Sequence, residues 1–106
     1  MTTDSFEDIK LTAREVKYFK MEGYIEQTLK VVRNSGLPFI AIKKCMSIAE
    51  VEECMKDFKA SSDRGKQLVA KTESLQEDIC QECVYLIKFS TEEPAEVTVH
   101  VQSKYA

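Results

Sequence analysis

The sequence has few of the residues and motifs on which catalysis and cofactor binding depend. Its three glycines, Gly23, Gly36 and Gly65, are scattered, and none belongs to a GxGxxG or GxxxxGK[ST] motif that cradles a phosphate. His100 is the only histidine, and no recognisable nucleophile motif accompanies it. A general base needs both a positioned partner and a nucleophile. The sequence therefore predicts a protein that is not an enzyme and needs no cofactor.

Long hydrophobic segments are absent as well. The longest unbroken apolar run, Leu37 to Ile42, has six residues, whereas a membrane-spanning helix needs about 20. The first ten residues are polar and acidic, with no basic segment leading into an apolar one, which argues against a conventional secretory signal. We therefore expect a cytoplasmic protein with no membrane partner, and we expect its four cysteines to be reduced in that compartment.

The composition that remains is typical of a small globular domain. The 106 residues are 43% hydrophobic and 31% charged, which suits a single domain over residues 1–106 with one modest core. Charge is distributed unevenly: residues 1–36 are neutral overall, residues 37–71 carry +2 and residues 72–106 carry −5. The acidic final third weighs against nucleic-acid binding there, because affinity for phosphates depends on cationic side chains.

Apolar spacing predicts a long helix after a loosely ordered lead-in over residues 1–11. Thr12-Ala13-Arg14-Glu15 is a capping-box pattern, typical of a helix N-terminus. The apolar residues behind it recur every three or four positions, as on one face of a helix: Tyr18, Met21, Ile25, Leu29 and Val32. Gly36 and Pro38 then favour termination. The sequence therefore predicts a helix between Thr12 and Gly36.

Three further elements are predicted in the middle of the chain. Residues 38–44 are short, apolar and partly β-branched, which predicts a buried strand. A second capping box, Ser47-Ile48-Ala49-Glu50, precedes apolar residues at helical spacing up to Phe58 and predicts a second helix. A third helix is predicted from the spacing of four residues: Leu68, Thr72, Leu75 and Ile79.

The final part of the chain alternates between apolar and polar residues, as half-buried antiparallel strands do. Apolar side chains recur at every second position of two runs, residues 85–89 and 97–101. With a turn at Thr91–Ala95, they predict a C-terminal antiparallel hairpin. The predicted fold is a single small α+β domain of order α-β-α-α-β-β, with helices packed on one face of a small sheet. Thr98, His100 and Gln102 would lie on the open face of that sheet.

The cysteines allow two interpretations besides free thiols. Cys80-Gln81-Glu82-Cys83 has the spacing of a redox or metal motif, but it follows a predicted helix. A helix C-terminus and nearby acidic residues disfavour a thiolate, so free thiols are the favoured interpretation. The first alternative is a small zinc-stabilised domain whose ligands come from a four-cysteine set: Cys45, Cys54, Cys80 and Cys83. The second is a disulfide in an oxidising setting.

Binding to another protein is the function that the sequence favours. The predicted N-terminal helix carries apolar residues beyond its main face, namely Val16, Phe19 and Tyr24, and such surplus surface suits a partner. The last strand offers a sheet edge and the polar set Thr98, His100 and Gln102. We therefore expect an adaptor, an inhibitor or an assembly subunit, with a homodimer as one form of partner.

Nucleic-acid binding is the alternative function. The predicted N-terminal helix carries cations at helical spacing, and a stripe of this kind binds phosphate backbones or acidic partners. The residues of this stripe are Arg14, Lys17, Lys20, Lys30 and Arg33. Acidic residues interleave with the stripe, and the final third of the chain is acidic. We therefore favour a protein partner over a nucleic acid.

Overall fold

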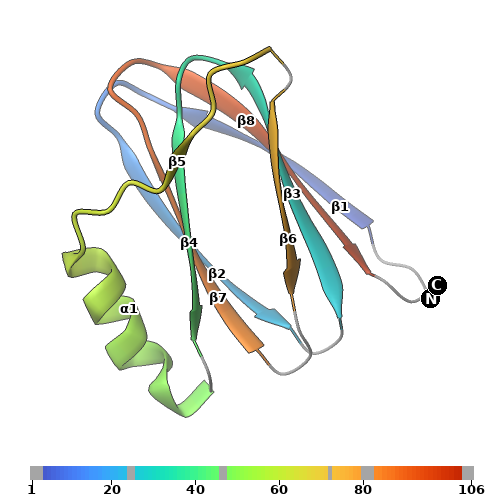
Figure 1. Cartoon of the computed structure of the whole chain (residues 1–106), viewed down its shortest axis with the longest axis vertical. Helices are drawn as coiled ribbons and strands as arrows, with labels where there is room; N and C mark the ends of the chain where they lie inside the picture. Colours follow the sequence, from blue (N-terminus) through green and yellow to red (C-terminus); the bar gives the residue numbers. More distant parts are fainter. Residues whose placement is uncertain (1–3, 24–25, 46–47, 72, 80–82, 104–106) are drawn as a thin grey trace.

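The chain forms a β-sandwich with one short helix on its outside (Figure 1). The computed structural model describes residues 4–23, 26–45, 48–71, 73–79 and 83–103. Over these residues there are eight strands, in two four-stranded antiparallel sheets, and a single α-helix. The predicted α+β fold, with three helices packed on a small sheet, is therefore wrong. None of the described helices has the length and the apolar character needed to span a lipid bilayer.

The two sheets have the same number of strands and interleave along the chain. Sheet A contains, in spatial order, β1 (Asp4–Leu11), β8 (Ala95–Ser103), β3 (Gln27–Ser35) and β6 (Ser74–Ile79). Sheet B contains β2 (Val16–Gly23), β7 (Cys83–Ser90), β4 (Phe39–Cys45) and β5 (Lys66–Gln67). The chain changes sheet at every connection except that between β4 and β5. This order is the jelly-roll arrangement of eight antiparallel strands.

Alternate side chains of both sheets point into a shared apolar core. Leu29 and Val31 of β3 and Val97 of β8 are fully buried there, facing Ile87 and Phe89 of β7. This period of two is what strands with one face on a core require. Val97, Val99 and Val101 share the face of β8 that packs on the core, as the alternation over residues 97–101 predicts, although this face meets the opposite sheet instead of helices.

The short helix packs on the outer face of sheet B. It comprises a 3-10 turn, η1 (Ile48–Glu50), followed by α1 (Val51–Ala60). Phe58 of α1 is buried against Val84 and Leu86 of β7. A disulfide joins Cys54 of α1 to Cys45 of β4. The second predicted helix and the predicted strand over residues 38–44 are thus confirmed, and Ser47 of the second capping box lies outside the described residues.

The long N-terminal helix is replaced by strands β2 and β3. The apolar residues that suggested this helix occur on both faces of β2, because α1 packs on the outer face and the core lies on the inner face. Tyr18 points outward and packs edge-to-face on Phe58 of α1, with ring centroids 6.1 Å apart, whereas Met21 contacts the inner core. Apolar residues therefore do not alternate strictly along β2, and their spacing imitates a helix. Residues 4–11, expected to be a loosely ordered lead-in, form β1, which buries Ile9 and Leu11.

Two further predictions are corrected by the topology. The third predicted helix is replaced by β5 and β6, and Leu75 and Ile79 of β6 contact the core with the period of a strand. The predicted C-terminal hairpin does not form, because β7 pairs with β2 and β4 in sheet B while β8 pairs with β1 and β3 in sheet A. Since β8 is paired on both sides, it offers no free sheet edge.

Candidate functional site: the uncovered face of sheet A

The two outer faces of the sandwich are covered differently. Helix α1 packs on β4 and β7 of sheet B. Among the described residues, no helix packs on the outer face of sheet A, which we call the A face. Strand alternation and register place these side chains on it: Phe6, Asp8, Lys10, Thr28, Lys30, Val32, Asn34, Ser74, Gln76, Asp78, Glu96, Thr98, His100 and Gln102. All of them are exposed or half-buried.

An aromatic pair lies on the β1–β8 side of the A face. Phe6 and His100 are register partners on β1 and β8, and their rings stack with centroids 4.0 Å apart and planes 7° from parallel. Phe6 is 68% exposed, the highest value among the large exposed hydrophobic residues of the described chain. The Nε2 atom of His100 is buried and has no hydrogen-bond partner among the described residues. The apolar Phe6 ring is therefore exposed to solvent while it stacks on the His100 ring.

Hydrogen bonds between side chains hold the neighbouring row of the A face in place. The Thr98 hydroxyl donates to Oδ1 of Asp8 on β1 at 2.7 Å and accepts from Nδ2 of Asn34 on β3 at 2.7 Å. These bonds join three adjacent strands through one side chain. Strands with paired backbones and linked side chains give a surface whose shape is set before any partner arrives.

The charges of the A face are mixed in sign. Two cations, Lys10 and Lys30, share it with three carboxylates, those of Asp8, Asp78 and Glu96. A surface that binds nucleic acid is expected to carry a clear excess of cations. A mixed surface with an exposed aromatic ring is instead typical of contacts between proteins.

The structure places the residues predicted to bind a partner in two different environments. Thr98, His100 and Gln102 lie together on the A face, with Gln102 exposed at the end of β8. Val16 is 47% exposed at the start of β2, and Phe19 packs edge-to-face on Phe89 in the core, with ring centroids 5.5 Å apart. Tyr24 lies outside the described residues. Val16 and Phe19 therefore lie on opposite faces of a strand and do not share an apolar helix surface.

Phe6 is the residue of this site that was not predicted from the sequence. The signal was present, since Ile9 and Leu11 are apolar at alternate positions while Phe6, Asp8 and Lys10 occupy the other face of the same strand. This pattern did not decide the prediction, because the polar and acidic composition of the first residues is equally typical of a disordered segment.

The basic stripe of the nucleic-acid alternative is divided between several elements. Arg14 lies in the turn between β1 and β2, Lys17 and Lys20 lie on β2, and Lys30 and Arg33 lie on β3 of the other sheet. The Lys17 ammonium donates to the Lys10 carbonyl at 3.0 Å, and Nε of Arg33 donates to the Gly36 carbonyl at 2.5 Å. The five cations therefore do not form one surface.

The cysteines are oxidised where the structure describes them. Cys45 and Cys54 form a disulfide with their Cα atoms 6.3 Å apart, and Cys83 is also disulfide-bonded. Cys80 lies outside the described residues. The expectation of reduced thiols is wrong for these three residues, since their sulfurs are bonded to sulfur. Zinc is bound by thiolates, so the disulfide form does not supply a four-cysteine site.

Comparison with known proteins found no matching protein family, no similar curated protein and no similar solved structure. What the chain does is therefore argued from the geometry of its own residues.

Proposed function

We propose that this chain is a non-enzymatic protein-binding module that docks another protein on the A face. The observation that carries the proposal is the Phe6 ring, 68% exposed and stacked flat on His100, on a sheet face that no described helix covers. Aromatic residues in fixed positions are the usual energetic centres of protein interfaces. An adaptor, an inhibitor and an assembly subunit all fit this mode of action.

The surroundings of the aromatic pair support a protein partner over a nucleic acid. Thr98, Asn34 and Gln102 offer hydrogen-bonding groups around the ring, and the charges nearby are of both signs. Interfaces between proteins combine an apolar centre with a polar rim in this way. The hydrogen bonds of Thr98 to Asp8 and Asn34 order these side chains in the free protein, which lowers the entropy cost of binding.

Affinity capture with matched variants tests this proposal. The wild-type chain is used to capture partners from its source cells, and the captured protein is purified for binding measurements. Phe6→Ala is expected to weaken binding at least tenfold, because removing an aromatic hot-spot residue typically costs about 2 kcal/mol or more. His100→Ala removes the base of the stack and is expected to act in the same direction.

Exposed hydrophobic residues elsewhere on the molecule provide the control. Val69 is 55% exposed and lies outside the A face, so Val69→Ala should leave affinity unchanged. If Phe6→Ala and Val69→Ala bind alike, the A face is not the docking surface. Sedimentation velocity of the wild-type and Phe6→Ala chains determines whether the partner is a second copy of the chain, since only that case gives a dimer lost in the variant.

The cellular location also belongs to this proposal. The sequence leads us to propose the cytoplasm, whereas the Cys45–Cys54 disulfide favours an oxidising compartment, because cytosolic thiols are kept reduced. Alkylation of the protein under denaturing conditions, directly on extraction from its source cells, distinguishes the two. Alkylation of Cys45 and Cys54 would support the cytoplasm, and their protection would support an oxidising compartment.

A further inference from the structure

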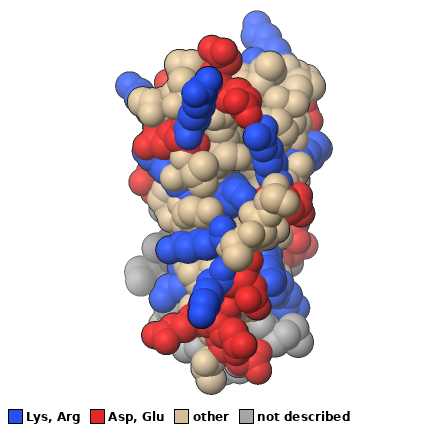
Figure 2. All heavy atoms as spheres, turned by 90° about the vertical axis from the view of Figure 1, so that its left-hand side faces the viewer, with Lys and Arg blue, Asp and Glu red and all other residues tan. Residues whose placement is uncertain are grey.

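A second site candidate lies on the other side of the sandwich, beyond the area that α1 covers. It is a cavity of about 450 Å³ at the end of β7, between the β1–β2 turn and the loop that follows α1. Arg14 and Arg64 line its walls, and Lys88 and Ser90 lie in its floor. Figure 2 shows this side of the molecule, where Lys and Arg side chains extend along the surface among acidic ones.

Three of the residues that line the cavity are buried and polar, namely Lys88, Ser90 and Thr91. Lys88 and Ser90 occupy successive outward positions of β7 and are only 7% and 8% exposed. The Lys88 ammonium donates to the carbonyls of Ser61 at 3.3 Å and Asp63 at 2.9 Å, which leaves one of its three hydrogens. The Ser90 hydroxyl has no hydrogen-bond partner among the described residues. A buried hydroxyl without a partner is costly, and a ligand that accepts its hydrogen would remove that cost.

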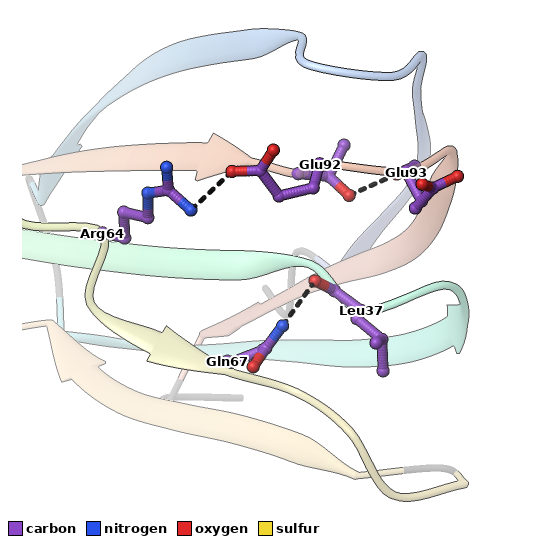
Figure 3. Close-up of polar contacts among 6 residues, drawn as sticks. Leu37, Arg64, Gln67, Glu92 and Glu93 are labelled. Atoms are coloured by element: carbon purple, nitrogen blue, oxygen red, sulfur yellow. Dashed lines mark hydrogen bonds and ion pairs between the residues drawn. The ribbon is translucent and has the colours of Figure 1, made fainter.

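The walls carry two guanidinium groups from distant parts of the sequence. Arg64 lies over the Phe39 ring, 5.2 Å from its centroid, and Phe39 is the register partner of Ser90 on the neighbouring strand. One Arg64 nitrogen, Nη1, pairs with Oε1 of Glu92 at 2.7 Å, as Figure 3 shows. A guanidinium has five N–H donors, so this ion pair leaves most of its donors for a ligand.

The balance of charge in the cavity defines the kind of ligand. Three cations, Arg14, Arg64 and Lys88, line it together with one carboxylate, that of Glu92, so the lining carries a net charge of +2. Guanidinium forks match the oxygens of a phosphate group, and a phosphate monoester is close to a dianion at neutral pH. Volumes between about 300 and 1,000 Å³ are usual for small-molecule sites, so the cavity holds more than a phosphate ion.

We propose that this cavity binds a small phosphate monoester, with the phosphate group between Arg14 and Arg64 above Lys88 and Ser90. The organic part of the ligand would occupy the rest of the cavity, beside Val16 and Ser62. The sequence does not reveal this site, because its cations are separated by 50 and 24 positions and belong to no phosphate motif. The site is distinct from the A face, so its test does not depend on the protein partner.

Titration of the isotopically labelled chain, followed by amide NMR shifts, tests the proposal. The probes are inorganic phosphate and phenyl phosphate, each compared with sodium chloride at equal ionic strength. Both probes are expected to shift amides of residues 14–16, 62–65 and 90–92, and phenyl phosphate is expected to bind more tightly. Absence of shifts beyond those of chloride would overturn the proposal, and equal affinity for the two probes would overturn its monoester part.

Variants identify the residues that hold the phosphate. Arg14→Gln and Arg64→Gln should each raise the Kd for phenyl phosphate at least tenfold. Glu92→Gln should lower the Kd, since it removes the carboxylate that competes for Arg64. Ser90→Ala should raise the Kd without lowering the thermal midpoint, because the hydroxyl makes no bond in the free protein. Lys56 is an exposed cation on α1 and serves as the control. If Lys56→Gln raised the Kd for phenyl phosphate by the same factor, net charge would explain the effect and the proposed site would be overturned.

Discussion

Arg14 occupies a backbone conformation that favours glycine. Its φ is 64°, and it is the one non-glycine residue with positive φ in the part of the chain that the structure describes. The turn around it is held by the Thr12 N–H, which donates to Oε1 of Glu15 at 2.9 Å. This backbone hydrogen bond is the main reason that the pKa of Glu15 lies below its ordinary value. The backbone of Arg14 therefore adopts a conformation that costs stability, and its cationic side chain lies at the cavity wall.

Replacing Arg14 by glycine should therefore stabilise the fold. Arg14→Gly is expected to raise the free energy of unfolding by about 0.5–1 kcal/mol, because glycine adopts positive φ without steric cost. The same variant should bind phenyl phosphate more weakly. Urea unfolding measures the first effect, with Arg14→Ala as the control that keeps a Cβ atom. If the glycine and alanine variants are equally stable, the conformation of residue 14 carries no cost.

The capping-box pattern of residues 12–15 shows how far a local motif predicts structure. One of its two bonds forms as expected, since the Thr12 N–H donates to the Glu15 carboxylate. The other does not, because the Glu15 N–H donates at 3.1 Å to the Thr12 backbone carbonyl instead of the Thr12 hydroxyl. They close a turn between two strands instead of starting a helix. One local hydrogen bond could thus be predicted from the sequence, whereas the element that follows depends on distant contacts.

Secondary structure could be predicted from the sequence for those elements that pack against the protein on one face only. The alternation of Val97, Val99 and Val101 gave the inner face of β8, and α1 has a single apolar side. Apolar spacing predicted a helix wrongly in β2, because both faces of this strand are packed: Tyr18 contacts α1 and Met21 contacts the core. The pairing of β7 and β8 with strands of different sheets could not be predicted, because it is set by residues far apart in the chain.

The disulfide between Cys45 and Cys54 fastens α1 to β4. The double variant Cys45→Ala/Cys54→Ala should lower the free energy of unfolding by about 2–3 kcal/mol, the loop-closure entropy expected for a loop of about ten residues. Hydrogen exchange should become faster in α1 while β1 and β8 stay protected, since only the packing of its apolar side, with Phe58 buried, would then hold the helix. Unchanged stability and unchanged exchange would show that packing alone positions α1.

Glu73 caps the turn that precedes β6. Its Oε1 atom accepts the N–H groups of Ala70 at 2.9 Å and Val69 at 3.0 Å, and its other oxygen lies 3.5 Å from the Lys66 ammonium. The backbone hydrogen bonds, first from Ala70 and then from Val69, lower the pKa of Glu73 from its ordinary value of 4.5. The folded state therefore binds fewer protons than the unfolded state in acid, and this stabilisation is lost as the pH falls below the ordinary value.

Glu73→Gln should consequently be less stable than the wild type at pH 7, with a difference that shrinks as the pH falls from 4.5 through the lowered pKa. Thermal melts across this range measure the difference. Glu52→Gln, at an exposed position of α1, serves as the control for the loss of one negative charge. A difference for Glu73→Gln that stayed constant with pH would mean that ionisation of this carboxylate does not stabilise the turn.

In the whole molecule, we propose that the two sides of the sandwich have different roles. The A face carries the Phe6–His100 stack for a protein partner, and the outer face of sheet B carries α1 and the cavity at Lys88 and Ser90. Because packed sheets lie about 10 Å apart, substitutions on opposite faces should act independently. Phe6→Ala should leave phenyl phosphate affinity unchanged, and Arg64→Gln should leave partner affinity unchanged.

Site-specific photo-crosslinking determines whether the A face is the docking surface. A photoreactive phenylalanine analogue is placed singly at Phe6, Lys30 and Gln76, register neighbours across the A face, and at Glu52 on α1 as the control. The chains are irradiated with the captured partner, and the adducts are measured by mass spectrometry. We expect adducts from the three A-face positions and none from position 52. Adducts from position 52 alone would contradict the proposal.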